Sequence, residues 1–341
     1  MADPRFTDTL LAWYAEFRRD LPWRGLQDPY AVWLSEIILQ QTRIAQGKAY
    51  WERFMARFPD VRQLAAASEE EVLQLWEGLG YYSRARNLLA AARQIAAQGS
   101  FPDTWEGIRA LKGVGDYTAA AIASIAFGRD TAAVDGNVYR VLARYYGIAT
   151  PVGGPVAKKE FTRLAQSLLP PGRAGDFNQA LMDFGALQCT PAHPDCLTCP
   201  LSAHCAALQK GQVAVLPVKQ EKPAVKTRYL DYIYLRCQGR TAIRKRGAGD
   251  IWQGLWEPLC IEYADAAHTQ SLSGAVRPEG CTCLRRGVRH CLTHRTILAD
   301  FYLLEAPGFP TLPEGYITIA ESALSQYGKP RLFELLLETA G

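Results

Sequence analysis

Four closely spaced cysteines are the first residues of the sequence that could do chemistry. Only one of their three gaps is the two-residue gap that zinc knuckles favour, and the outer gaps are six and five residues long. Four such thiolates can enclose a zinc ion or a [4Fe–4S] cluster, and the long outer gaps suit the larger cluster better. Such a cluster has no open position for substrate, so we expect it to brace a loop; four buried free thiols are the alternative. The four are Cys189, Cys196, Cys199 and Cys205.

A glycine-rich turn between two expected helices lies in the segment Leu111 to Ala119. Gly113 and Gly115 allow the backbone to approach an anion closely, and the start of the next helix directs free amides at that anion. This is the helix-hairpin-helix pattern, which binds a DNA phosphate without reading base sequence. A lone turn of this kind would usually only separate two helices, but the flanking helices and the downstream cysteines favour DNA binding.

Two carboxylates stand in very different surroundings. Asp135 ends an apolar run and precedes Gly136 and Asn137, so it is expected to cap the helix that follows. Glu36 stands among apolar residues from Ala31 to Leu39, where loss of water would raise its pKa and suit it to act as a general acid. Taken alone, each has a simpler interpretation, Asp135 as a cap and Glu36 on the wet edge of its helix.

The elements that must position these groups are helical in the first part of the chain. From Thr7 to about Gly211 we predict one helix after another. Asp28-Pro29 is a cap followed by a proline in the first turn, Asp103 to Glu106 resembles a capping box, and the run from Tyr117 stops at Gly128.

The remainder of the chain is predicted to be α+β. Residues 213–228 contain two prolines and show little periodicity, which is typical of a linker. Two β-rich runs, Tyr229 to Cys237 and Arg240 to Arg246, are separated by Gln238-Gly239, a hairpin-turn pattern. Thr296 to Leu304 is predicted to be another strand, and Pro330 to Thr339 a closing helix.

Composition narrows the class of protein. The 341 residues are 48% apolar and 21% charged, values of an ordinary globular chain. The longest uncharged apolar stretch, Tyr117 to Gly128, is too short to cross a bilayer, and Met1 to Asp20 is too charged for a signal peptide. We therefore expect an intracellular protein without a membrane partner. Because the net charge is only +4, contact with a polyanion must depend on local patches and backbone amides.

Several motifs in register resemble one family. Four segments, the hairpin and the cysteines follow the order found in the endonuclease III superfamily of base-excision DNA glycosylases. The four segments are Leu21 to Arg24, Ser35 to Arg43, Gly78 to Arg86 and Val134 to Arg144. Within it they resemble the MutY-type adenine DNA glycosylases. The resemblance covers nearly the whole length and implies a helix-hairpin-helix catalytic domain with a [4Fe–4S] loop.

The resemblance implies a reaction. The substrate would be double-stranded DNA in which adenine is mispaired with 8-oxoguanine or guanine, and the adenosine would be flipped out of the duplex. Glu36 would protonate the adenine ring, and Asp135 would stabilise the oxocarbenium-like sugar and assist the attack of water, or attack transiently itself. Tyr117 and Asn137 would orient Asp135 and the flipped nucleotide.

The resemblance also implies roles in DNA binding. Gln41 and Tyr81 would wedge into the gap in the duplex. Trp23, Arg24 and Arg84 would line or approach the adenine pocket. Ordinary core packing is the alternative for Trp23 and Tyr81.

One position separates the chain from related glycosylase–lyases. Those enzymes carry a lysine immediately before the threonine of the hairpin, and this lysine forms a Schiff base with the sugar. Here that residue is Tyr117, whose phenol cannot form one, and Lys112 lies earlier in the turn. We therefore expect a monofunctional glycosylase without efficient strand cleavage at the abasic site.

The second domain resembles the Nudix-like recognition domain of the same family. Trp252 to Pro258 matches its Gly-Leu-Trp-Glu segment, and the catalytic box of Nudix hydrolases is absent. His290 to His294 resembles the loop that inspects 8-oxoguanine, with His294 retained, Leu292 in place of the usual phenylalanine and Thr293 in place of serine. Loss of the aromatic ring is expected to weaken the preference for 8-oxoguanine. Four nearby arginines could contact phosphate or form a solvated surface: Arg285, Arg286, Arg289 and Arg295.

The expected organisation is therefore a catalytic domain over residues 1–212, with the cluster loop at 189–205, a linker over 213–228 and a recognition domain over 229–341. We expect a monomer in the bacterial cytoplasm, associated with the nucleoid. An oxidised-pyrimidine glycosylase–lyase is disfavoured by Tyr117 and by the extra domain. A catalytically idle DNA-binding scaffold would need neither acid, and a Nudix hydrolase would need the missing box.

Overall fold

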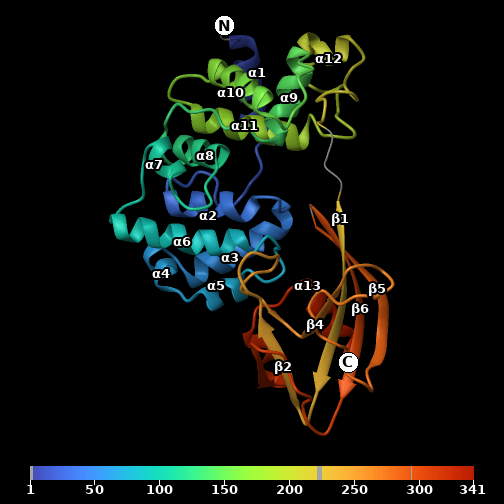
Figure 1. Ribbon diagram of the computed structural model, residues 1–341. Coiled ribbons are helices and arrows are strands. Elements are labelled where there is room, and N and C mark those ends of the chain that lie inside the picture. The colour runs from blue at the N-terminus through green and yellow to red at the C-terminus, as the bar shows by residue number, and fades with distance from the viewer. Residues whose placement is uncertain (1–2, 221–224, 293) are drawn as a thin grey trace. The chain divides into compact units, whose positions relative to one another are not determined.

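The computed structural model describes residues 3–220, 225–292 and 294–341. Its contacts divide the chain into two compact units (Figure 1). The first contains Met1–Ala66 and Asn87–Glu221, and the second contains Ala67–Arg86 and Lys222–Gly341. Residues 67–86 thus group with the C-terminal part, although the expected domains placed them in the first. That the expected domains, residues 1–212 and 229–341, fold separately stays a prediction.

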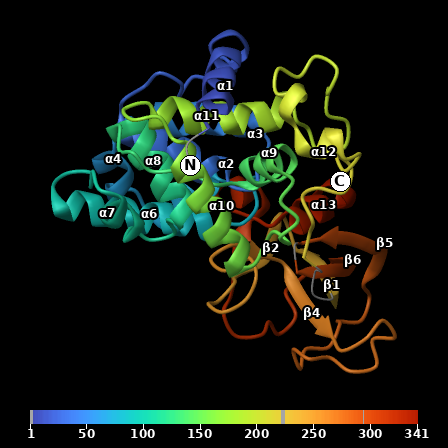
Figure 2. The same cartoon turned by 90° about the horizontal axis from the view of Figure 1, so that it is seen from above.

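The first unit is helical, as predicted. Helix α11 contacts α1, α8 and α9, helix α10 contacts α1 and α9, and helix α2 contacts α3 and α8 (Figure 2). Of the helices that the structure describes, none offers an apolar stretch that would reach across a lipid bilayer. The helices that lie wholly in this unit are α1 (Pro4–Phe17), α2 (Pro29–Leu39), α3 (Ile44–Arg57), α4 (Val61–Ala66), α7 (Trp105–Arg109), α8 (Asp116–Phe127), α9 (Gly136–Tyr146), α10 (Pro155–Leu168), α11 (Ala174–Leu187) and α12 (Ala206–Gln209), with the 3₁₀ turn η1 (Ser202–His204). Helix α6 (Ser83–Gln98) begins in the second unit and continues into the first.

Local sequence signals set the ends of several of these helices. Asp28 caps α2 by accepting from the Tyr30 amide, and the proline that follows starts the helix. Thr104 caps α7, so the cap is the second residue of the expected Asp103–Glu106 box. Gly128 ends α8 in the left-handed conformation, with φ at 63°.

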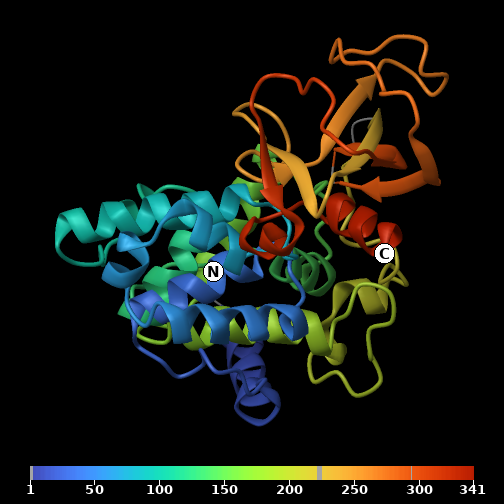
Figure 3. The same ribbon diagram turned by 90° about the horizontal axis from the view of Figure 1, so that it is seen from below.

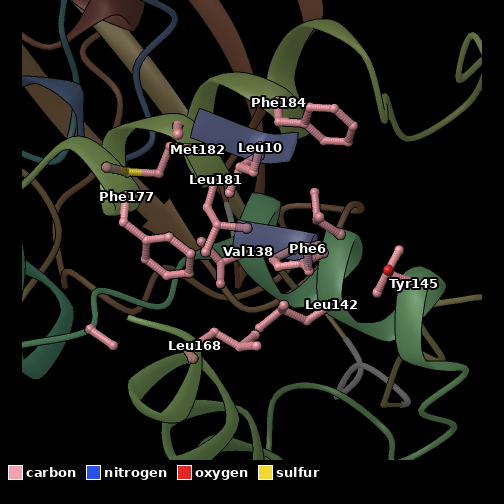
Figure 4. Packing of buried hydrophobic residues seen from close by; sticks show 14 of the residues in the cluster. Phe6, Leu10, Val138, Leu142, Tyr145, Leu168, Phe177, Leu181, Met182 and Phe184 are labelled. Atoms are coloured by element: carbon pink, nitrogen blue, oxygen red, sulfur yellow. The ribbon is translucent and has the colours of Figure 1, made fainter. Parts of the chain in front are cut away.

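A large apolar core holds α1, α9, α10 and α11 together (Figure 4). Phe6, Leu142, Phe161, Phe177 and Leu181 have no exposed surface within it. Burial of side chains of this size contributes roughly 1.5–3 kcal/mol each to folding. The core therefore provides a rigid base for the loop ends that carry the polar residues described below.

The second unit contains two sheets. The larger has the order β4-β1-β6-β5, with β1 parallel to β6 and both outer pairs antiparallel, and the smaller has the antiparallel order β3-β2-β7. Helix α13 packs on β1, β5 and β6 and ends at the C-terminus (Figure 3). The elements are α5 (Glu69–Leu75), β1 (Lys226–Arg236), β2 (Arg240–Lys245), β3 (Trp256–Glu257), β4 (Leu259–Tyr263), β5 (Thr282–Cys291), β6 (Arg295–Glu305), β7 (Tyr316–Ala320), the 3₁₀ turn η2 (Glu321–Gln326) and α13 (Arg331–Ala340).

The predicted hairpin turn is confirmed. Cys237 and Arg240 exchange two backbone hydrogen bonds around Gln238 and Gly239, whose φ angles are 50° and 74°. The two strands then diverge, because β1 joins the larger sheet and β2 the smaller. Strand β5 was not predicted: its arginine-rich sequence lacks regular apolar alternation, and pairing with β6 holds it in the sheet despite two register shifts.

Candidate active site

A cavity of about 490 Å³ lies among the helices of the first unit. Its walls come from α2, α8, α9 and α11 and from the segment before α2. The structure brings together here six residues that the sequence marked as candidates, although 113 residues of chain lie between the first and the last: Trp23, Arg24, Glu36, Tyr117, Asp135 and Asn137.

Glu36 reaches this cavity from the last turn of α2. Its neighbours Ser35, Ile37 and Ile38 are buried, so the carboxyl has little access to water. Burial raises the pKa of Glu36 to about 7, although a hydrogen bond from Tyr117 and the charge of Arg24 oppose this shift. A carboxyl with such a pKa carries its proton for much of the time near neutral pH and can donate it.

Tyr117 lies in the first turn of α8. Its phenol hydroxyl also lies 3.1 Å from the sulfur of Met182 on α11. Burial and the nearby carboxyls of Glu36 and Asp135 raise the pKa of Tyr117 well above its ordinary value. The hydroxyl therefore stays protonated and serves Glu36 as a hydrogen-bond donor.

Asp135 caps α9, as its sequence context predicts. One oxygen, Oδ1, accepts from the amides of Asn137 and Val138, both at 2.9 Å. The other, Oδ2, accepts from the Asn137 side-chain amide at 2.7 Å. These three donors and the positive end of the helix dipole match a carboxylate that is ionised. Asp135 thus both caps α9 and lines the cavity.

Asn137 is itself held in place from behind. Its side-chain oxygen accepts from the Arg140 guanidinium at 2.8 Å, and Arg140 also donates to the carbonyls of Gly185 and Cys189. A Cβ on Gly185 would lie 2.6 Å from the Cβ of Asn137, so only glycine lets α11 come this close. The amide that supports Asp135 therefore has a fixed orientation.

The sequence reasoning missed the residues that hold Arg24 in place. Arg24 donates to the Tyr14 hydroxyl at 2.7 Å and to Asp183 at 2.8 Å, and it contacts the Gln179 side chain. Asp183 is completely buried and also binds Arg19. A signal was present in α11, because Gln179 and Asp183 are polar residues four apart and so lie on one face of the helix.

The glycine-rich turn joins α7 to α8 as a helix-hairpin-helix. Gly113 has φ at 77°, and a Cβ there would lie 2.6 Å from the Cβ of Asn87. Gly115 is the cap residue of α8 and offers no side chain to its free amides. These amides therefore remain available for a phosphate oxygen.

The four cysteines line one small cavity between α9 and the chain that follows α11. Arg144 holds this loop by donating to Cys189 Sγ at 3.4 Å, to Thr190 O at 2.7 Å and to Pro191 O at 3.0 Å. No three of the four sulfurs, all of which the structure describes, lie within 4.8 Å of one another. Four thiols around one cavity are nevertheless a donor set that can hold a metal centre.

A second cavity, of about 670 Å³, lies within the second unit. It brings the loop from Gly78 to Ser83 beside the end of β5, so the predicted residues Tyr81, Leu292 and His294 share one site. Trp252 and Arg331 also line it and were not predicted. Thr293 lies outside the described residues.

The structure also defines the contacts of Arg84 and the backbone conformation of Gln41 and Tyr81. Arg84 does not line the cavity of Glu36. Its guanidinium donates to the carbonyls of Leu79 and Gly80 and lies 5.0 Å from the Trp76 ring, so it braces the loop that carries Tyr81. Gln41 and Tyr81 both have positive φ, at 58° and 48°, a strained conformation for residues other than glycine.

The arginines near the second cavity divide into two groups. Arg285, Arg286 and Arg289 are exposed on β5. Arg295 donates to Asp250 at 3.1 Å. The three arginines of β5 could therefore contact phosphate without breaking an ion pair like the one between Arg295 and Asp250.

Two family models match the chain. Residues 34–171 match the HhH-GPD superfamily base excision DNA repair protein model, and residues 231–339 match the NUDIX domain model. The first match includes Glu36, the hairpin and Asp135. The second includes β1 to α13 except for the first residues of β1 and the last residue of α13.

Curated relatives carry one common description, "Adenine DNA glycosylase". The protein of Schizosaccharomyces pombe is 38% identical over 400 aligned positions, covering 95% of this chain and 87% of the relative. That of Buchnera aphidicola from Acyrthosiphon pisum is 35% identical over 254 positions, covering 74% and 73%. The Mus musculus protein is 46% identical over 239 positions, but the match covers 65% of this chain and 46% of the mouse protein. The chain thus spans about half the length of the mammalian relatives.

Solved structures of similar fold come from related repair enzymes. A thermostable thymine-DNA glycosylase has a TM-score of 0.55 and 33% identity, over 60% of this chain and 95% of its own. Endonuclease III in a non-covalent complex with DNA has a TM-score of 0.52 and 21% identity, over 61% and 95%, a likeness of fold alone.

Proposed function

This chain belongs to the adenine DNA glycosylase family, and we propose that it excises adenine from DNA by hydrolysing the N-glycosidic bond. The observation that carries this proposal is the pair of carboxyls in one cavity: Glu36 with its pKa raised to about 7, and Asp135 bound by three N–H groups. One carboxyl that holds a proton beside one that is charged is the arrangement that cleavage of a glycosidic bond needs.

The first step is departure of the base. A flipped adenosine enters the cavity, and Glu36 donates its proton to a ring nitrogen of adenine. The bond electrons then leave with a neutral base rather than with an anion. Tyr117, kept neutral by burial, steadies Glu36 with its hydroxyl.

The second step belongs to the sugar. The developing oxocarbenium ion is positive, and the Asp135 carboxylate stabilises it or adds to it transiently. Water then adds to the anomeric carbon and loses a proton, which leaves an abasic site. Asn137 and Arg140 keep the carboxylate oriented during this step.

We propose that the enzyme is monofunctional. Strand cleavage by a glycosylase–lyase needs an amine that can form a Schiff base with the sugar. Among the described residues that line the cavity of Glu36 there is no lysine, and the position of the lyase lysine is Tyr117. The abasic product should therefore remain uncut.

We propose 8-oxoguanine or guanine as the base opposite the adenine. The second cavity places an aromatic ring, imidazoles and arginines together, which can stack on a base and bind its edge. Tyr81 is 49% exposed and can enter the duplex, while the hairpin amides grip a phosphate. We propose that a [4Fe–4S] cluster fills the cysteine site. Cys189, Cys196, Cys199 and Cys205 would hold it, and it would brace the loop.

The experiment is a single-turnover assay on a duplex with one adenine opposite 8-oxoguanine, using protein with its cluster loaded. Half of each sample is treated with alkali to cut abasic sites. We expect strand breaks only after alkali and no adduct trapped by borohydride. Breaks before alkali with a trapped adduct would overturn the monofunctional assignment, and absence of base release would overturn the activity itself.

A further inference from the structure

A cluster of possible metal ligands lies outside both cavities, in the second unit. Asp231 on β1 and Asp300 on β6 are paired across two parallel strands, so both side chains point to the same face of the sheet. His268, in the connection between β4 and β5, joins them. One ligand atom from each of the three lies within 4.8 Å of the other two.

Asp231 is the unusual member of this cluster. Its side chain has no exposed surface, and Oδ2 accepts from Tyr263 at 3.1 Å and Arg277 at 3.3 Å. Its other oxygen, Oδ1, has no hydrogen-bond partner in the part of the chain that the structure describes. His268 Nδ1 lies 3.7 Å from that oxygen. A buried carboxylate oxygen without a donor is destabilising, and a cation beside it would supply the missing partner.

The other two ligands are already oriented. Asp300 Oδ1 accepts from the Gly287 amide at 2.8 Å, which leaves Oδ2 for another partner. The His268 ring stacks on Tyr263, with centroids 4.2 Å apart and planes 7° from parallel. Little rotamer freedom would be lost when an ion binds.

We propose that Asp231, His268 and Asp300 form a binding site for a divalent cation, which ties the β4–β5 connection to the larger sheet. Two carboxylates and one imidazole are a donor set for Mn²⁺ or Zn²⁺. Donors around one such ion stand about 3–4 Å apart, since each bond is about 2.0–2.2 Å long. Here Asp231 Oδ1 and His268 Nδ1 are 3.7 Å apart, and one ligand atom from each residue lies within 4.8 Å of the other two.

Arg277 is the group that opposes this site. Its guanidinium contacts Asp231 Oδ2 and lies 4.3 Å from the Tyr302 ring, yet its side chain is 41% exposed. The arginine therefore limits affinity for a cation and can turn toward water when an ion arrives.

The test is a titration of the full-length, cluster-loaded protein with Mn²⁺, followed by electron paramagnetic resonance of the free ion and by calorimetry. Mn²⁺ is the probe because it prefers oxygen ligands, whereas Zn²⁺ would also bind the five cysteines outside the cluster loop. We expect one saturable site and a rise in melting temperature with Mn²⁺. His268→Gln and Asp300→Asn should each weaken binding about tenfold or more. His294→Gln, which removes an imidazole elsewhere, should bind Mn²⁺ as the wild type does.

Two further variants keep the proposal testable if those proteins fold poorly. Arg277→Gln removes the opposing charge and should tighten Mn²⁺ binding several-fold. Asp231→Asn should fold, because it removes a poorly compensated buried charge, yet lose the site. Equal Mn²⁺ affinity in the wild type, His268→Gln and Asp231→Asn, or no saturable binding in the wild type and Arg277→Gln, would overturn the site. Neither result would bear on adenine excision, which depends on other residues.

Discussion

The two cavities of the molecule are built from different structure and carry different side chains. In the first unit the walls are helix ends, and the polar groups are two carboxyls held by a phenol, an amide and arginines. In the second unit the walls are a loop and strand ends, and the groups are aromatic rings, imidazoles and arginines. Cleavage of a glycosidic bond needs two carboxyls whose protonation states differ. Recognition of a base needs a complementary surface and hydrogen-bond donors. We therefore propose that the first cavity cleaves the glycosidic bond and that the second chooses the opposite base.

The largest effect is expected from Asp135→Asn. Asparagine still caps α9, but it cannot stabilise a positive sugar, so the rate of adenine release should fall by about 10³-fold or more, whatever base is opposite. Single-turnover kinetics on duplexes with 8-oxoguanine or guanine measure this. Asp28→Asn changes another helix cap, that of α2, and should keep wild-type rates. An equal loss in both variants would assign Asp135 to folding alone.

Next in size is Glu36→Gln, which removes the proton donor and should slow release by about 10²–10³-fold. The pH profile sharpens this prediction. Because the protonated form acts and its pKa is about 7, the wild-type rate should be steady below pH 7 and fall about tenfold per pH unit above it. The Gln variant should lack that decline, and Glu52→Gln, on the exposed surface of α3, should retain it. The same profile in wild type and Glu36→Gln would exclude Glu36 as the acid.

Gly113→Ala should weaken DNA binding by about tenfold for every duplex. The new Cβ would meet Asn87 and would hold a residue other than glycine at a φ of 77°, so the turn must shift away from the phosphate. Fluorescence anisotropy measures the affinity. Gly99 also has a positive φ, of 83°, but lies outside the hairpin. The Gly99→Ala variant therefore separates the effect of backbone strain from the effect of a lost phosphate contact. A Gly113 variant with full affinity would remove the hairpin from the interface.

The smallest effect, and the one specific to the second cavity, is expected from His294→Ala. Loss of one base contact should lower the preference for 8-oxoguanine over guanine about fivefold to tenfold, with the rate of the chemical step unchanged. Arg289→Ala, on exposed β5, should weaken both duplexes alike. An unchanged preference in His294→Ala would show that the second cavity does not choose the base.

Much of the fold could be predicted because its signals are local. Helix caps at Asp28 and Thr104, the left-handed stop at Gly128 and the turn at Gln238-Gly239 each depend on a few adjacent residues. Strand β5 could not be found in this way, since its basic sequence is held by pairing with a distant strand. The same reason hides the grouping of residues 67–86 with the C-terminal part.

The sequence by itself determined which residues have the right chemistry: two carboxyls, a phenol where a lyase has an amine, and four spaced thiols. Tertiary structure decided how they behave. The pKa of Glu36 is raised because packing removes water around it, and Asp135 is held by an amide whose orientation depends on Arg140 and Gly185. Arg24 contacts Gln179 and Asp183 only because the segment before α2 lies beside α11 in the folded chain. Desolvation and long-range hydrogen bonds depend on distant parts of the chain, so spacing along it cannot predict them.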